Sequence, residues 1–205
     1  MRRRLPDKRQ AILDAAVKVF AGKGFFRSRV SEIAREAGVA DGTIYLYYKN
    51  KDDILISIFE LKMQEVIRNF RNAVAREKDA VSRMECLIRM HLEEFQANPD
   101  LAAVFQVELR RSSRFMREYR KRELREYLDL IGEIIRQGQQ EGFFRQDLPL
   151  GLVKRLIFGT LDELVSTWVL AGRRYELRPL AEPVMDLFLR GIGGEGDAAD
   201  RRPVL

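Results

Sequence analysis

Hydroxyl-bearing and basic side chains gather between residues 30 and 51, in the segment VSEIAREAGVADGTIYLYYKNK. Hydroxyl and ammonium groups hydrogen-bond the phosphate oxygens of nucleic acid, and Thr and Leu side chains contact the methyl group of thymine. Ile44 and Tyr48 lie four residues apart, so both point inward if this stretch is helical. The outer face and flanks of that helix then carry Gly42, Thr43, Tyr45, Leu46 and Tyr47. We expect such a helix to lie in a major groove.

A second short helix must come before it to hold it in place. The apolar residues between Val30 and Ala37 follow the spacing i, i+3, i+4 and i+7, which is one face of a helix. Gly38 is expected to end that helix, and Asp41 to cap the next one. Asn50 and Asp53 predict a capping box at the start of a third helix. This layout predicts a helix-turn-helix DNA-binding unit, because a hairpin that only packs into a core has no reason to expose Thr, Leu and Tyr.

The segment resembles the DNA-binding half of the TetR family of bacterial regulators, from the glycines at 22 and 24 through IAREAGVADGTIYLYYKNK to a long fourth helix. The resemblance implies a DNA-binding regulator that is not an enzyme, with a variable all-helical effector and dimer domain. Arg29 is a departure, since the family often has Thr or Ser before the second helix. Lys51, at the start of the third helix, is expected to bind phosphate. The predicted DNA contacts are Arg29, Ser31, Asp41, Gly42, Thr43, Tyr45, Leu46, Tyr47, Lys49 and Lys51.

The charge distribution supports a polyanionic partner for this part of the chain. Residues 1–52 contain 12 Lys and Arg against 6 Asp and Glu, whereas the remaining residues contain 25 of each kind. The whole formal charge of +6 therefore falls on the predicted DNA-binding part. Such an excess attracts double-stranded DNA.

Apolar spacing along the rest of the chain predicts an all-α fold of about nine helices. Besides the two short helices, the predicted ones span about residues 7–21, 51–76, 80–96, 101–111, 113–141, 148–170 and 178–192. We divide the chain into a helix-turn-helix domain (1–52), a helical effector-binding and dimerisation domain (53–192) and a frayed tail (193–205).

The composition argues against an enzyme. His91 is the only histidine, so one subunit cannot hold a Ser-His-Asp triad or a multi-histidine metal site. We expect no metal, no cofactor and no catalytic residue, and His91 is expected to be an ordinary core or surface residue. The single cysteine Cys86, the lack of a signal-peptide pattern and the lack of a run of ~20 apolar residues predict a cytoplasmic protein that does not enter a membrane.

The helix predicted at 148–170 carries apolar residues on more than one face. One face can join the core of its own domain, and the other needs a partner. The small residues Gly159 and Thr160 allow a second helix to approach closely. We therefore expect a homodimer formed with the last helix, although a fully buried helix of a monomer is the alternative.

Arginines are concentrated between residues 110 and 122, where only Glu118 opposes them. They either form a solvated helix face or bind an anion, because the guanidinium fork matches phosphate geometry. The apolar run LAAVFQVEL comes directly before them. A ligand with a long apolar tail and a phosphate-rich head would suit both features.

The segments GVADGTIYLYYKNKDDIL, VELRRSS and FGTLDELVSTWVL together resemble the TetR-type regulators of fatty-acid degradation. This resemblance implies a repressor that leaves its operator on binding long-chain acyl-CoA. The ligand contacts predicted on this basis are Phe105, Leu109, Arg110, Arg111, Arg114, Tyr127, Asp162 and Trp168. The alternative is a repressor of an efflux or other gene with a different hydrophobic ligand, but a pocket for cationic drugs favours acidic residues over this arginine cluster.

Overall fold

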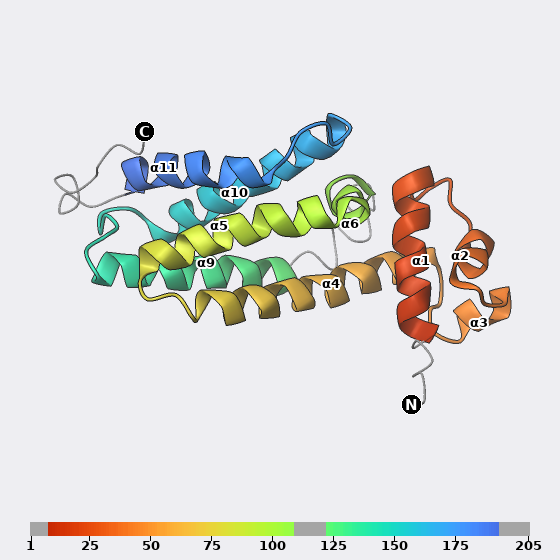
Figure 1. Cartoon of the computed structure of the whole chain (residues 1–205). Helices are drawn as coiled ribbons and strands as arrows, with labels where there is room; N and C mark the ends of the chain where they lie inside the picture. Colours follow the sequence, from red (N-terminus) through yellow and green to blue (C-terminus); the bar gives the residue numbers. More distant parts are fainter. Residues whose placement is uncertain (1–7, 109–121, 193–205) are drawn as a thin grey trace, which may run out of the picture. The chain divides into compact units, whose positions relative to one another are not determined.

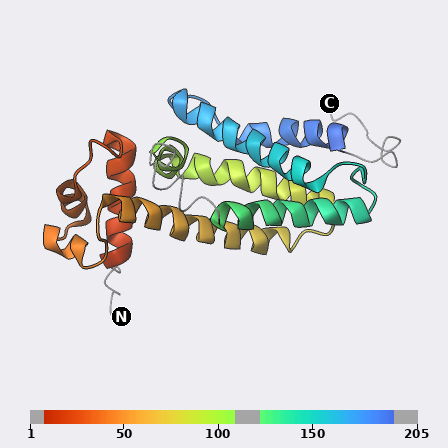
Figure 2. The same ribbon diagram turned by 180° about the vertical axis from the view of Figure 1, so that it is seen from behind.

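A computed structural model of the chain describes residues 8–108 and 122–192 (Figures 1 and 2). These residues are mostly helical and contain no β-strand, which confirms the all-α prediction. None of the helices among them is long and apolar enough to cross a membrane. They divide into two compact units, one drawn from residues 8–64 and 98–108 and the other from residues 65–97 and 122–192.

The first unit contains the predicted DNA-binding helices together with a segment from the middle of the chain. Its elements are α1 (Lys8–Lys23), α2 (Val30–Ala37), α3 (Asp41–Tyr45), the first half of α4 (Lys51–Val74), α6 (Pro99–Ala103) and the π-helix η1 (Val104–Glu108). Helix α1 packs against α2, α6 and η1, and α2 packs against α3. Fully buried side chains close this core, among them Ile12, Phe20, Ile33, Ile54 and Val104.

The second unit is a bundle built around α5. It contains the end of α4, α5 (Ala80–Ala97), α9 (Arg122–Gln140), α10 (Leu150–Leu170), the 3-10 helix η2 (Arg178–Leu180) and α11 (Ala181–Ile192). Helix α5 lies against α9, α10 and α11, and α9 lies along α10 (Figures 1 and 2). Its core includes Leu87, Ile88, Ile131, Ile157 and Leu161.

Helix α3 differs in two ways from its prediction. It ends at Tyr45 and the chain turns before Tyr48, although Ile44 and Tyr48 are both buried as their spacing predicts. Asp41 does not cap the helix, because Ala40 occupies the N-cap position and Asp41 is the first helical residue. A carboxylate in the first turn is still favourable, since it faces the positive end of the helix dipole.

The helix predicted at 101–111 begins two residues earlier and changes type. Pro99 starts α6, where a residue without an N–H loses no hydrogen bond, and α5 ends at Ala97, one residue after the predicted end. From Val104 the chain continues as η1. Of the helix predicted at 113–141, the described part is α9.

Candidate nucleic-acid interface and effector site

The surface around α3 exposes side chains that a core would normally bury. Leu46 is 81% exposed, and Tyr45 and Tyr47 also stand in solvent, whereas Tyr48 beside them is 2% exposed. Exposed large apolar side chains that lie together mark a binding surface. Other predicted DNA contacts are exposed as well, namely Arg29, Ser31, Asp41, Gly42 and Lys49, and Thr43 is half-buried.

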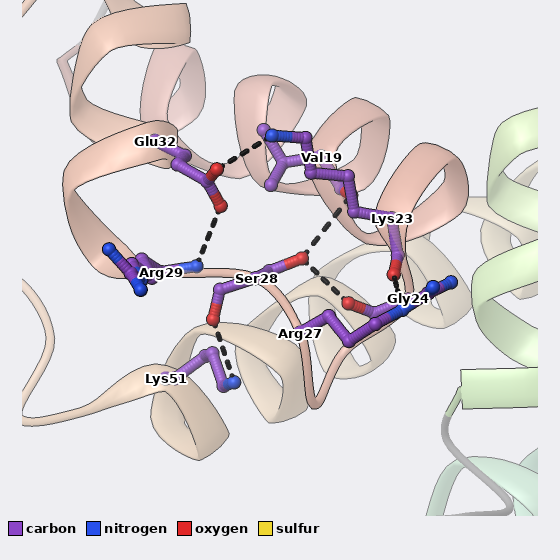
Figure 3. A network of polar contacts seen from close by, with 8 residues as sticks. All are labelled: Val19, Lys23, Gly24, Arg27, Ser28, Arg29, Glu32 and Lys51. Carbon is purple, nitrogen blue, oxygen red and sulfur yellow. Dashed lines mark hydrogen bonds and ion pairs between the residues drawn. The ribbon is translucent and has the colours of Figure 1, made fainter.

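Helix α2 begins with a cap supplied by its own first turn (Figure 3). The Glu32 carboxylate accepts the backbone N–H of Arg29 at 2.9 Å and pairs with the Lys23 ammonium at 2.6 Å. The hydrogen bond from Lys23 is the main reason why the pKa of Glu32 lies below its usual value. Ser28 turns inward and donates its hydroxyl to the Gly24 carbonyl at 2.7 Å. The Arg29 side chain makes no capping hydrogen bond and remains exposed.

Lys51 lies under the loop between α1 and α2. Its ammonium donates to the carbonyl oxygens of Phe25 at 2.5 Å, Ser28 at 2.9 Å and Phe26 at 3.2 Å. It also lies 4.5 Å from the centre of the Phe25 ring. Figure 3 shows the bond to Ser28. Burial lowers the pKa of Lys51 below its usual value. An ammonium has three donors, so a contact between Lys51 and a DNA phosphate requires the loss of one of these bonds.

A buried carboxylate ties the same loop to η1. Glu108 Oε2 accepts the backbone N–H of Phe25 at 2.7 Å, and the Glu108 side chain is buried. Gly24 has a φ of +81°, which favours glycine, and an added Cβ would only make ordinary contact with Glu108 Oε1 at 3.6 Å. The loop before α2 is therefore held by Lys51 from one element and by Glu108 from another.

The predicted ligand residues fall in different parts of the chain. Phe105 is buried in the first unit, where its ring lies 5.3 Å from that of Phe59. Tyr127, Asp162 and Trp168 belong to the second unit. The Trp168 indole N–H donates to the Tyr175 carbonyl at 2.6 Å, so this group serves the turn after α10. The remaining predicted ligand residues, Leu109, Arg110, Arg111 and Arg114, lie outside the described residues.

A polar pair that the sequence analysis did not single out lies inside the second unit. His91 Nδ1 and the Tyr127 hydroxyl are 2.8 Å apart, and both residues are buried. Burial lowers the pKa of His91 to about 4, with a smaller opposite effect from Asp162. The available signal was spacing, because His91 lies four residues from the buried Leu87 and Phe95 on α5. This spacing places a polar ring on a core-facing stripe.

Comparison with known proteins identifies the family. Residues 12–58 match the model of "Bacterial regulatory proteins, tetR family", and residues 59–191 match that of "YsiA-like protein, C-terminal region". The chain belongs to the TetR family. The helices α2 and α3 fall within the first match, and the TetR-family assignment makes the chain a transcriptional regulator and not an enzyme.

Relatives within the TetR family include regulators of lipid metabolism. The "Fatty acid metabolism regulator protein" of Bacillus subtilis is 40% identical, over 94% of this chain and 98% of that protein. The repressor KstR2 of Rhodococcus jostii is 25% identical, over 90% and 91% of the two chains. Among solved structures, FadR of Bacillus subtilis in complex with stearoyl-CoA is 40% identical, covers 89% of this chain and 98% of that one, and has a TM-score of 0.85. FadR of Bacillus halodurans matches at 40% identity over the same shares, with a TM-score of 0.84.

Proposed function

We propose that this TetR-family chain is a homodimeric repressor of fatty-acid degradation genes in the cytoplasm, and that long-chain acyl-CoA releases it from its operator. The observation that carries the proposal is the likeness, over nearly the whole chain, to the Bacillus subtilis FadR that binds stearoyl-CoA. The division into a DNA-binding domain at 1–52 and an effector and dimer domain at 53–192 belongs to the same proposal.

The DNA-binding surface is built from α2, α3 and the turn after α3. Thr43 and Leu46 would contact base edges, and the hydroxyls of Tyr45 and Tyr47 would contact phosphates on either side of the groove. The exposure of Tyr45, Leu46 and Tyr47 and the partial exposure of Thr43 support these roles. In a dimer, two such surfaces meet half-sites about one helical turn apart.

The dimer would form through α10 and α11. Helix α10 buries Val153, Ile157 and Leu161 in its own unit, yet leaves Leu152 and Leu156 exposed on another face. Gly159 and Thr160 continue that exposed face at the next turn, and Leu170 and Leu187 are further exposed leucines on α10 and α11. A second copy of the chain would cover these side chains across a two-fold axis.

The effector would use both polar and apolar contacts. Arg110, Arg111 and Arg114 would bind the phosphates of the CoA head, because each guanidinium offers a fork of donors. Phe105 and Leu109 would supply apolar contacts, and Tyr127 and Asp162 lie around the buried His91.

Release of the operator follows from a difference in affinity between two states of the protein. Acyl-CoA would bind the state whose two DNA-binding surfaces no longer match the half-site spacing. The bond between Glu108 and Phe25 supports such coupling, because it connects residues next to the predicted effector contacts with the loop before α2.

The proposal is tested by selecting operator DNA from random duplexes and measuring its release by acyl-CoAs of rising chain length. Long-chain acyl-CoA is expected to release the DNA, and free CoA and free fatty acid to do far less, since each buried CH₂ contributes about 0.8 kcal/mol. Operator binding that no acyl-CoA changes would remove the effector from the proposal and favour a repressor with a different hydrophobic ligand.

A further inference from the structure

In the buried pair of His91 and Tyr127, one hydrogen-bonding atom has no partner among the described residues. His91 is 5% exposed and Tyr127 is 1% exposed, and Nδ1 of His91 faces the Tyr127 hydroxyl. The other ring nitrogen, Nε2, has no hydrogen-bond partner among the residues that the structure describes. Buried polar atoms without a partner are rare in proteins, and each one calls for a missing water, ion or ligand.

Aromatic rings from three helices surround this pair. The Phe95 ring of α5 lies 5.1 Å from the His91 ring, centre to centre. The rings of Phe70 from α4 and Phe158 from α10 lie 6.0 Å and 5.8 Å from Tyr127, which belongs to α9. An alkyl chain suits such walls, whereas a charged group does not.

The protonation states determine what Nε2 can bind. The imidazole is neutral at neutral pH, and burial raises the pKa of Tyr127 far above its usual value, so the phenol keeps its proton. If Tyr127 donates this proton to Nδ1, its O–H is satisfied and the imidazole hydrogen lies on Nε2. In the opposite tautomer Nδ1–H donates to the Tyr127 oxygen. Nε2 would then lack a donor, and the phenol O–H would also lack an acceptor. The arrangement with fewer unmet groups therefore makes Nε2–H a donor.

We propose that His91 Nε2–H donates a hydrogen bond to the thioester carbonyl oxygen of a bound acyl-CoA, whose alkyl chain lies against the surrounding aromatic rings. This inference rests on the proposed function and adds a residue that recognises the thioester. A thioester carbonyl is an uncharged acceptor at the end of a long alkyl chain, as the site requires. A free fatty acid would bring a carboxylate close to Asp162, whose charge acts on both His91 and Tyr127. The same site therefore selects the thioester over the free acid.

The single histidine allows a test on the unaltered protein. Full-length protein labelled with ¹⁵N-histidine gives the NMR signals of one imidazole. Stearoyl-CoA is expected to shift the Nε2–H resonance downfield, as a new hydrogen bond does. S-octadecyl-CoA, a thioether that lacks the carbonyl, is expected to bind without that shift.

Calorimetry on matched variants measures the same contact as an affinity. Wild type is expected to bind stearoyl-CoA about fivefold more tightly than S-octadecyl-CoA, the usual effect of one neutral hydrogen bond. His91→Phe should bind both ligands equally. Phe95→Leu, which alters only the apolar wall, should weaken both and keep the ratio. If His91→Phe does not fold by circular dichroism, His91→Gln, which retains a donor, is expected to keep part of the ratio.

The outcomes separate this inference from the function on which it rests. Equal binding of the two ligands by wild type, or an Nε2–H signal that responds alike to both, would overturn the role of His91 while leaving acyl-CoA as effector. A buried water molecule that binds Nε2 in place of the thioester would also make the two ligands bind equally. Binding of neither ligand, with operator binding intact, would overturn both.

Discussion

Glu108 and Phe25 are 83 residues apart in the sequence, yet the Glu108 carboxylate accepts the Phe25 backbone N–H at 2.7 Å in a buried position. This hydrogen bond connects η1 to the loop that leads into the helix-turn-helix. Hydrogen bonds to charged groups are stronger than neutral ones, and their loss leaves the remaining partner unsatisfied.

Glu108→Ala should therefore loosen the loop before α2. We expect a loss of about 2 kcal/mol in unfolding free energy and weaker operator binding. Glu108→Gln keeps an acceptor oxygen and should lose less. Chemical unfolding and fluorescence anisotropy with operator DNA measure the two effects, and identical values for both variants would show that the bond to Phe25 is unimportant.

Thr43 and Lys49 are predicted to contribute to DNA binding in different ways. Thr43→Ala should relax base preference without changing how affinity depends on salt. Lys49→Ala should weaken binding to all sequences and lower the slope of log K against log salt by about 1 per subunit. Binding measured on operator and on scrambled duplex at several salt concentrations separates these effects. A Thr43→Ala protein that keeps full sequence preference would exclude Thr43 from base reading.

Lys51→Ala and Lys49→Ala are a matched pair of variants that test the structural role of Lys51. Each replacement by Ala removes one positive charge, but only Lys51 donates to three backbone carbonyls. Lys51→Ala is expected to lower the unfolding free energy by about 2 kcal/mol, and Lys49→Ala to change it little. Thermal unfolding without DNA is the measurement. Equal stability of the two variants would argue that the loop does not depend on Lys51.

The lowered pKa of His91 predicts that the folded chain loses stability in mild acid. Its pKa in the folded chain is about 4, below the ordinary value of 6.5. Below pH 6.5 the unfolded chain binds a proton on this imidazole that the folded chain does not bind. The contribution of the neutral His91 to the unfolding free energy is therefore complete above pH 6.5 and is lost as the pH falls. We expect a decrease of about 1.4 kcal/mol per pH unit between pH 6 and 5, before most carboxylates titrate. His91→Phe should have a flatter profile in urea unfolding, and an unchanged profile would contradict the prediction.

Leu156 tests the proposed dimer. This exposed leucine of α10 should be covered by the partner, so Leu156→Arg is expected to yield monomers. Leu46→Arg changes another exposed leucine, which lies outside α10 and α11, and should leave the dimer intact. Sedimentation velocity at micromolar concentration distinguishes the species. A wild-type monomer under these conditions would exclude the dimer itself.

Local patterns in the sequence are sufficient to predict most of the described helices and which side chains around α3 are buried. The spacing of Ile44 and Tyr48 places both inside, and the glycine at 38 ends α2 with a left-handed φ of 68°. Asn50 accepts the Asp53 N–H at 2.9 Å, as the capping box predicts. These features depend on residues a few positions apart, which is the range over which helix periodicity and capping operate.

Contacts between distant residues are what the sequence alone does not reveal. The Lys51 ammonium was expected to face phosphate because it stands at a helix start, but a loop more than 20 residues earlier folds over it. Glu108 was part of an apolar run, and nothing in its neighbours indicates Phe25. His91 was expected to be ordinary because its partner Tyr127 is 36 residues away. Each of these depends on packing between elements.

The number of residues in the π-helix η1 determines the direction in which the Glu108 side chain points. A π turn closes its hydrogen-bonded ring one residue later than an α turn. If one residue were removed between Val104 and Glu108, the segment could continue as α-helix, where each residue rotates the next side chain by about 100° about the axis. A π turn holds one residue more than an α turn within about the same rotation, so Glu108 would still face Phe25, whereas an added residue would rotate it away by about 100°. Surface loops tolerate changes of length, but here a single inserted residue would break the link without altering any existing side chain.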